Sequence, residues 1–113
     1  MVTQVADRLV RRGITPTEIT QDGPRNDQGV HIGTMYRFKG LGYRCLIIAG
    51  VAEGLVPRTS VDAWERSDPS RHRSELHRGR SLLFVAATRA RDALAITWHG
   101  EPSRFLSPLL PGR

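Results

Sequence analysis

The first 28 residues show two different patterns of apolar and polar positions. Apolar residues at helical spacing predict an amphipathic helix that stops at Gly13. The positions of this helix that carry the spacing are Val2, Val5, Leu9 and Val10. Residues 14–28 are rich in Pro, Gly, Asn and Asp, so they are predicted to be mostly loop, with one helical turn at residues 17–19.

The middle of the chain predicts short elements around one strongly apolar strand. The alternation in residues 29–33 indicates a short strand, and residues 35–41 indicate a helical turn. Residues 43–50, Y-R-C-L-I-I-A-G, form an apolar run of the kind that parallel sheets cover on both faces. Residues 51–71 contain prolines and polar residues and predict a long loop.

The last third of the chain predicts one helix and one strand. Ser74 is a candidate cap for a helix that ends near Ala90, and the apolar second half of this helix should be buried against a sheet. Residues 93–98 predict another buried strand, and a final helical turn should end at Pro108. Strands that alternate with helices predict an α/β fold with a mostly parallel sheet flanked by helices, in a single domain of residues 1–113.

Charge points to an anionic partner without identifying it. The formal net charge is +6 and the isoelectric point is near 11, which favours nucleic acid, although a basic solvated surface explains the same numbers. Residues 66–91 hold seven arginines against Asp68 and Glu75. This cluster fits either a surface that follows phosphates or the solvation of a loop.

Cysteine usage and hydropathy limit the cellular compartment and the partners that we expect for the chain. The single cysteine, Cys45, excludes a disulfide framework and fits the reducing cytoplasm. No stretch has the length and apolar character of a membrane span, so we expect no membrane partner.

Several kinds of catalytic site have no counterpart in the sequence. The phosphate-binding pattern G-x-x-x-x-G-K-[ST] is absent, and no acidic pair follows an apolar strand to hold Mg²⁺. The four histidines lack metal-ligand spacing, and no G-x-S-x-G elbow frames a serine. The chain therefore does not resemble a complete enzyme by itself.

Two segments resemble motifs of one family. V-H-I-G-T-M-Y-R-F-K-G-L-G-Y-R-C-L-I-I-A-G-V-A-E-G-L-V-P, residues 30–57, resembles motif V and the following strand of UvrD/Rep-type superfamily 1 DNA helicases. R-S-L-L-F-V-A-A-T-R-A-R-D-A-L, residues 80–94, resembles motif VI of that family, and the closing S-R-F-L fits the element that follows. The resemblance covers about residues 5–107.

The resemblance implies half of a DNA motor. It implies that the chain is most of the second RecA-like domain. An upstream RecA-like domain would be its partner and would provide most of the binding site for ATP and Mg²⁺. The other partner would be single-stranded or duplex DNA. DNA repair would be a process in which such a motor acts. The alternative is a free-standing nucleic-acid-binding or protein-interaction module that reuses a helicase subdomain.

The resemblance also assigns roles to residues. Arg89 matches the motif VI arginine that reaches the γ-phosphate, where a guanidinium neutralises charge on the transferring group. Lys39, the only lysine, matches the motif V lysine, and with Gly40 and Gly42 it is expected at the nucleotide. Arg89 and Lys39 should converge on one cleft rim near the carboxyl edge of the strands.

The DNA side of motif V is expected to involve Thr34, Tyr36, Arg37 and Lys39. Thr34 is equally well explained as a cap at a strand end, and Arg37 as part of a solvated face. Tyr36 stands where the family usually has His, and it can stack on a base but cannot act as an imidazole. Gly42 stands where the family has a Glu that contacts the ribose.

Overall fold

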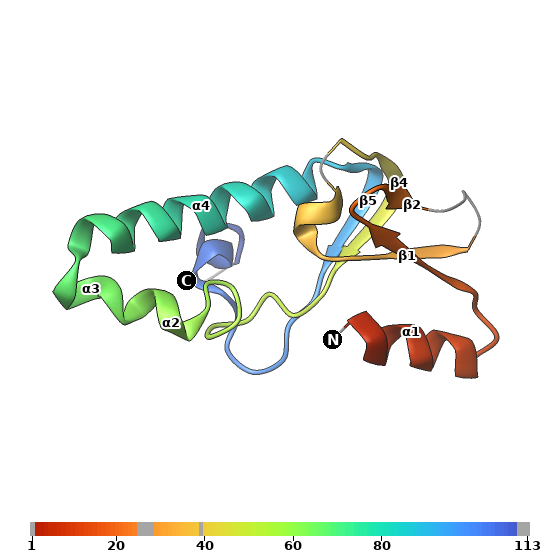
Figure 1. The fold of residues 1–113 in the computed structure, drawn as a ribbon, viewed down its shortest axis with the longest axis horizontal. Helices are drawn as coiled ribbons and strands as arrows, with labels where there is room; N and C mark the ends of the chain where they lie inside the picture. The colour runs from red at the N-terminus through yellow and green to blue at the C-terminus, as the bar shows by residue number, and fades with distance from the viewer. Residues whose placement is uncertain (1, 25–28, 39, 111–113) are drawn as a thin grey trace. The chain divides into compact units, whose positions relative to one another are not determined.

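The elements of the chain fall into two units, Met1–Leu41 and Gly42–Arg113 (Figure 1). A computed structural model describes residues 2–24, 29–38 and 40–110. The mixed α/β class predicted from the sequence is confirmed. Within the described residues the strands form two sheets, in the orders β2-β1-β3 and β4-β5, and each unit contains one of them.

The first unit places a helix against a small mixed sheet. Helix α1, Val2–Arg11, ends before Gly13, whose φ of 77° suits a glycine. Strand β1, Pro16–Thr20, pairs antiparallel with β2, Gly23–Pro24, and parallel with β3, Val30–Ile32. The predicted helix and the strand at residues 29–33 are therefore confirmed.

The loop predicted for residues 14–28 is wrong where β1 and β2 lie, and the helical turn predicted at residues 17–19 is wrong because these residues belong to β1. Thr17 and Ile19 of β1 are buried and Glu18 between them is exposed, which is the alternation of a half-buried strand. Pro16 stands at the first position of the strand, where the missing N–H is tolerated. Residues 25–28, also part of that predicted loop, lie outside the described residues.

The second unit is built on a parallel strand pair connected through a long helix. Strand β4, Tyr43–Ile48, pairs in parallel with β5, Ala90–Ile96. Between them come α2, Thr59–Asp62, α3, Trp64–Ser67, and α4, Pro69–Ala87, and the unit ends with η2, Arg104–Leu109. The core of the unit joins the strands, α4 and η2. Its buried apolar side chains include Leu46, Ile48, Val51, Leu83, Ala86, Phe105 and Leu106.

Three predictions for this unit are wrong in part. Residues 51–71 contain α2, α3 and the start of α4 rather than only loop. Helix α4 begins at Pro69, with the side chain of Asp68 as its cap, rather than at Ser74. Its second half is buried on one face only, because Leu83 and Ala86 are buried while Phe84 is 69% exposed.

The apolar strands are not covered on both faces within the described residues. Leu46 and Ile48 of β4 are buried, but Ile47 is 70% exposed and Cys45 is also exposed. The strand predicted at 93–98 begins earlier, at Ala90, and most of its residues are exposed. No helix in the described part of the chain combines the length and the apolar character needed to cross a membrane.

Candidate functional site

Motif V presents its side chains from a short helical turn in the first unit. Strand β3 is followed by Gly33 and Thr34, and then by η1, Met35–Phe38. A Cβ added at Gly33 would lie 3.1 Å from the Cβ of Ile19, so a larger residue would push β1 away. Phe38 is buried and anchors the turn, while Tyr36 is 67% exposed. The predicted helical turn is thus confirmed, and it turns the Tyr36 ring toward solvent.

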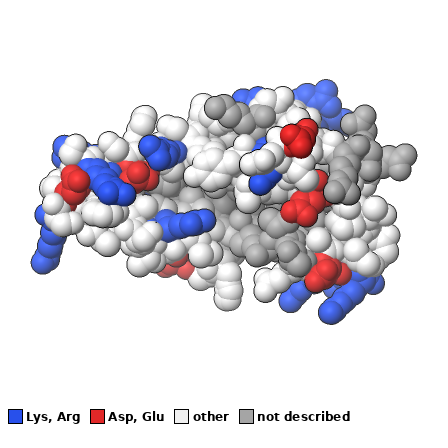
Figure 2. Space-filling model, viewed as in Figure 1, with Lys and Arg blue, Asp and Glu red and all other residues white. Residues whose placement is uncertain are grey.

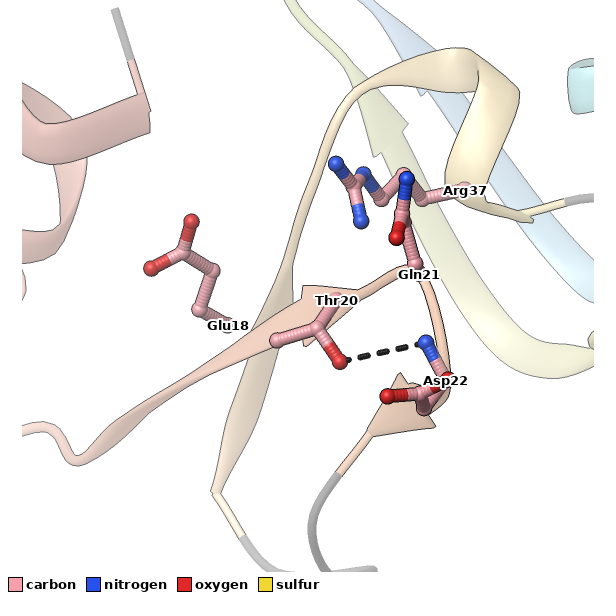
Figure 3. Close-up of a pocket in the computed structure, with 5 residues that line it drawn as sticks. All are labelled: Glu18, Thr20, Gln21, Asp22 and Arg37. Atoms are coloured by element: carbon pink, nitrogen blue, oxygen red, sulfur yellow. Dashed lines mark hydrogen bonds between the residues drawn. The ribbon is translucent and has the colours of Figure 1, made fainter.

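Tyr36 and Arg37 line an open hollow together with the β1–β2 turn. The hollow has a volume of about 540 Å³. Its lining residues are Thr20, Gln21, Asp22, Gly23, Tyr36, Arg37 and Leu41. The hydroxyl of Thr20 donates to the Gly23 carbonyl at 3.1 Å and accepts from the Asp22 N–H at 3.3 Å, which fixes the turn. Figure 3 shows the Gln21 side chain beside that of Arg37.

The groups around the hollow suit a nucleobase better than a bare phosphate. Glu18, Asp22 and Arg37 together line an adjoining hollow, so two carboxylates accompany one guanidinium on this side of the unit. A phosphate would meet attraction from Arg37 and repulsion from both acids. The exposed ring of Tyr36 can stack on a base, and the Gln21 amide can donate to and accept from a base edge. The carboxylates and Gln21 were missed from the sequence because residues 14–28 were predicted to be mostly loop.

Thr34 makes a structural contact that supports this turn. Its carbonyl accepts from the Arg37 N–H at 3.0 Å, and its side chain is exposed. The motif continues through Gly40, whose φ of 82° is readily adopted by glycine, to Leu41, whose N–H donates to the Phe38 carbonyl at 3.0 Å. Lys39, predicted at both the nucleotide and the DNA, lies outside the described residues.

Arg89 follows the end of α4 in the second unit. Its N–H donates to the Ala86 carbonyl at 3.1 Å, and its side-chain Nε donates to the Val85 carbonyl at 3.3 Å. These contacts with the last turn hold the half-buried side chain in place. The ion pairs found in the described part of the chain do not include Arg89. Its guanidinium therefore remains available to an anion.

The ends of the two motifs meet at the amino edge of the β4–β5 pair. The N–H of Tyr43, which follows Gly42, donates to the Arg89 carbonyl at 2.8 Å, and Tyr43 pairs with Ala90 in the register. Gly42 and Arg89 thus lie at the starts of neighbouring strands. The predicted location of Arg89 near the carboxyl edge is wrong, because α4 carries the chain back from the end of β4 to the start of β5.

A second charged cluster in this unit was missed from the sequence. The Arg104 guanidinium binds Glu53 and Asp62, each with a nitrogen–oxygen distance of 2.8 Å. The His72 Nε2 lies 3.1 Å from the Asp62 carboxylate. The cluster joins the loop after β4 to α2, α4 and η2. Glu53 comes from G-V-A-E-G-L-V-P and Arg104 from S-R-F-L, two segments of the family resemblance that the sequence did not pair with each other.

Hydrogen bonds within the cluster shift its ionisation. Bonds from Arg104, and then from His72, lower the pKa of Asp62 from 3.8 to about 2. Arg104 likewise lowers the pKa of Glu53, and the two carboxylates raise the pKa of Arg104. Each acceptor is thereby stabilised in its charged form. Since each member is paired with another member of the cluster, we interpret the cluster as structural support for the unit.

The donor sets of the described residues define no metal centre. No group of three or more His, Cys, Asp or Glu side chains that could hold an ion occurs there. The candidate site residues fall into two sets. Arg89 lies beside the amino edge of β4–β5 in the second unit, and Tyr36, Gln21 and Arg37 lie around the hollow of the first unit.

Comparison with known proteins places this chain in a helicase family. The model of the UvrD-like helicase C-terminal domain matches residues 12–101. The chain is 32% identical over 95 residues to the ATP-dependent DNA helicase UvrD2 of Mycobacterium tuberculosis, covering 74% of this chain and 13% of the relative. It is 31% identical over 93 residues to the putative ATP-dependent DNA helicase YjcD of Bacillus subtilis, covering 75% of this chain and 12% of that relative.

A solved structure shows the same fold. The C-terminal domain of a possible DNA helicase from Lactobacillus plantarum WCFS1 matches 97% of this chain and 56% of its own length, with a TM-score of 0.67 and 19% identity. The chain belongs to the UvrD-like helicase C-terminal domain family. The family predicted from the two motifs is thus confirmed, and the chain spans about an eighth of the length of the curated relatives named above.

Proposed function

We propose that this chain is the C-terminal portion of a UvrD-like ATP-dependent DNA helicase. Its two units, residues 1–113, would belong to one RecA-like domain, with β4 and β5 as part of a mostly parallel sheet. The parallel β4–β5 pair, connected through α4, supports this proposal, since such crossovers are the repeating unit of these sheets. An upstream RecA-like domain would bind ATP and Mg²⁺.

Arg89 would act as the arginine finger of the motor. The observation that carries this role is the meeting of the two motif ends, where the Tyr43 N–H binds the Arg89 carbonyl. This contact fixes the backbone from which the guanidinium projects, beside Gly42 and at the start of two strands. A guanidinium held there would stabilise charge on a γ-phosphate bound by the partner domain. Lys39, Gly40 and Gly42 would line the same nucleotide.

Thr34, Tyr36, Arg37 and Lys39 would contact single-stranded DNA. The exposed Tyr36 ring offers a stacking platform, and Arg37 offers a cation beside it. The nearby acids would disfavour a phosphate inside the hollow and leave it to a base. Binding at this surface alone should be weak, because a single ring and a single guanidinium contribute.

The first test is binding of an oligothymidylate to the isolated chain. Replacing Tyr36 by Ala should weaken binding roughly tenfold, since stacking on one ring contributes about 1–3 kcal/mol. Tyr36→Phe, which keeps the ring, is the matched control and should bind like the parent chain. Equal affinity of the Ala and Phe variants would remove Tyr36 from the DNA site.

The second test separates a motor fragment from a complete enzyme. The isolated chain should show no ATP hydrolysis above background, because the phosphate-binding and Mg²⁺-binding elements would lie in the upstream domain. Turnover by the isolated chain that falls in an Arg89→Ala variant would contradict the proposal. Tight single-strand binding without any upstream partner, with affinity that falls steeply with salt, would instead favour the free-standing module, because the motor fragment alone should bind only weakly.

A further inference from the structure

The exposed face of α4 carries a row of side chains that the helicase motifs do not use. Arg73, His77, Arg80 and Phe84 follow one another at steps of four, three and four residues, so they lie along one stripe of the helix. All four are exposed, and Phe84 is 69% exposed. Arginine side chains gather over the part of the second unit formed by α3 and α4 (Figure 2).

Helix α4 contributes no carboxylate to this row. Glu75 is the only acidic residue of α4, and it is half-buried and lies 3.7 Å from Arg78 on another side of the helix. The other exposed residues next to the row are hydroxyl-bearing, namely Ser70, Ser74 and Ser81. The face therefore presents cations and hydroxyl groups.

Within the described residues, the cations of the row differ from the other arginines of α4. Arg71 lies over the Trp64 ring at 3.9 Å, and Arg78 has Glu75. Arg73 has neither an ion pair nor a ring contact, and Arg80 has only the Phe105 ring at 5.3 Å; His77, which lies between them, also lacks both. Unpaired cations in a row, with no counter-charge from their own helix, leave a local excess of positive charge that an external anion can neutralise.

We propose that this α4 face binds the phosphate backbone of duplex DNA. Arg73 and Arg80 are seven residues apart, about 10 Å along the helix axis. Guanidinium groups at this separation can each form paired hydrogen bonds with a phosphate, and serine hydroxyls commonly add phosphate contacts. The surface belongs to the second unit and is distinct from the motif V residues of the first.

The shape of the face favours a duplex over other anionic partners. A 19-residue helix holds the cations at fixed intervals, which fits the regular phosphates of a duplex. Sites for single strands usually offer a series of aromatic rings, but this row has one ring, Phe84, at its end. An interface with an acidic protein would usually have an apolar centre, whereas the middle of this row is charged.

The test compares two double variants with the same loss of charge. Arg73→Gln/Arg80→Gln removes the row, and Arg71→Gln/Arg78→Gln removes two paired arginines from another side of the same helix. Affinity of the full chain for a labelled duplex of about two helical turns is measured by fluorescence anisotropy over a range of salt concentrations. Circular dichroism confirms that both variants keep their helix content.

The row variant should bind the duplex at least tenfold more weakly, with a salt slope smaller by about two. The control variant should lose much less affinity. Equal losses in both variants would overturn the proposal, because they would show a general effect of net charge. An equal loss for single-stranded DNA, or equally effective competition by polyglutamate, would also overturn it. The row variant should keep the Tyr36-dependent binding of oligothymidylate, so failure here is distinct from failure of the motif V site.

Discussion

Gly79 lowers the helix propensity of α4 but allows closer packing against η2. A glycine inside a helix costs about 1 kcal/mol relative to alanine, and this one lies in the middle of α4. A Cβ added there would lie 3.3 Å from Cε2 of Phe105, closer than ordinary contact. The glycine thus lets η2 approach α4 and bury the Phe105 ring against it.

A larger residue at this position should destabilise the second unit. Gly79→Val should lower the free energy of unfolding by about 1–3 kcal/mol, because its branched side chain must displace Phe105. The check is chemical denaturation, with Ser81→Val on the exposed face as the control for β-branching in the same helix. If both variants lose the same stability, the Phe105 contact does not explain the glycine.

Arg104 should determine how stability responds to acid. The folded-state pKa of Asp62 is depressed to about 2, so its contribution is fully present above pH 4 and is lost as the pH falls toward 2. Arg104→Gln should lower stability at neutral pH by roughly 1–2 kcal/mol, a figure kept small because these side chains are partly exposed. The same substitution should also make the free energy of unfolding less dependent on pH between pH 4 and pH 2.

Thermal melts from pH 7 to pH 2 provide the measurement. The matched control is Arg44→Gln, which breaks a pair with Asp92 in which both side chains are more than half exposed. This control should change the melting temperature little at any pH. If Arg104→Gln loses stability in acid as much as the parent chain does, the cluster is not the cause of that loss.

Helix α4 is the element that connects the core of the second unit to two of the proposed sites, Arg89 and the arginine row. Its buried side packs Leu83 and Ala86, its end holds Arg89, and its exposed side carries the arginine row. Its first turn is fixed by Asp68, whose carboxylate accepts from the Arg71 N–H at 3.1 Å, and by Pro69 at the start. Both are standard features of a helix amino terminus.

Loss of this cap should weaken α4 measurably. Asp68→Ala should lower the free energy of unfolding by about 1 kcal/mol, whereas Asp68→Asn should retain most of the stability because an amide oxygen also accepts from the backbone. Urea unfolding followed by circular dichroism is the measurement. Equal stability of the Ala and Asn variants would mean that the side-chain bond contributes nothing.

The elements differ in how far the sequence could predict them. The amphipathic pattern of α1 and the apolar run of β4 are local signals, and both were predicted correctly. Strand β1 was missed because its first residue is Pro16 and because its partner β3 lies ten or more residues away. The true start of α4 could have been predicted, since Asp68 followed by Pro69 is a recognisable cap and first position.

At the scale of the whole molecule, two short motifs identified the family. They did not predict where the site residues lie in the fold. The positions of Gly42 and Arg89 at the amino edge follow from the direction of the crossover helix, which the predicted order of elements already contained. The hollow beside Tyr36 could not be predicted, because it depends on a turn between two strands that have few apolar residues. The Arg104 cluster depends on contacts between segments 42 and 51 residues apart.

The most direct test of the helicase assignment is a nuclear magnetic resonance titration of the isolated chain with inorganic tripolyphosphate. Weak, millimolar binding is expected, and it should shift the backbone amide signals of Gly42, Tyr43, Arg89 and Ala90. These shifts should disappear in an Arg89→Gln variant, even if signals along the exposed face of α4 still move. Shifts at this amino edge that are unchanged in Arg89→Gln, or their absence in the parent chain, would contradict the assignment of Arg89 to a phosphate.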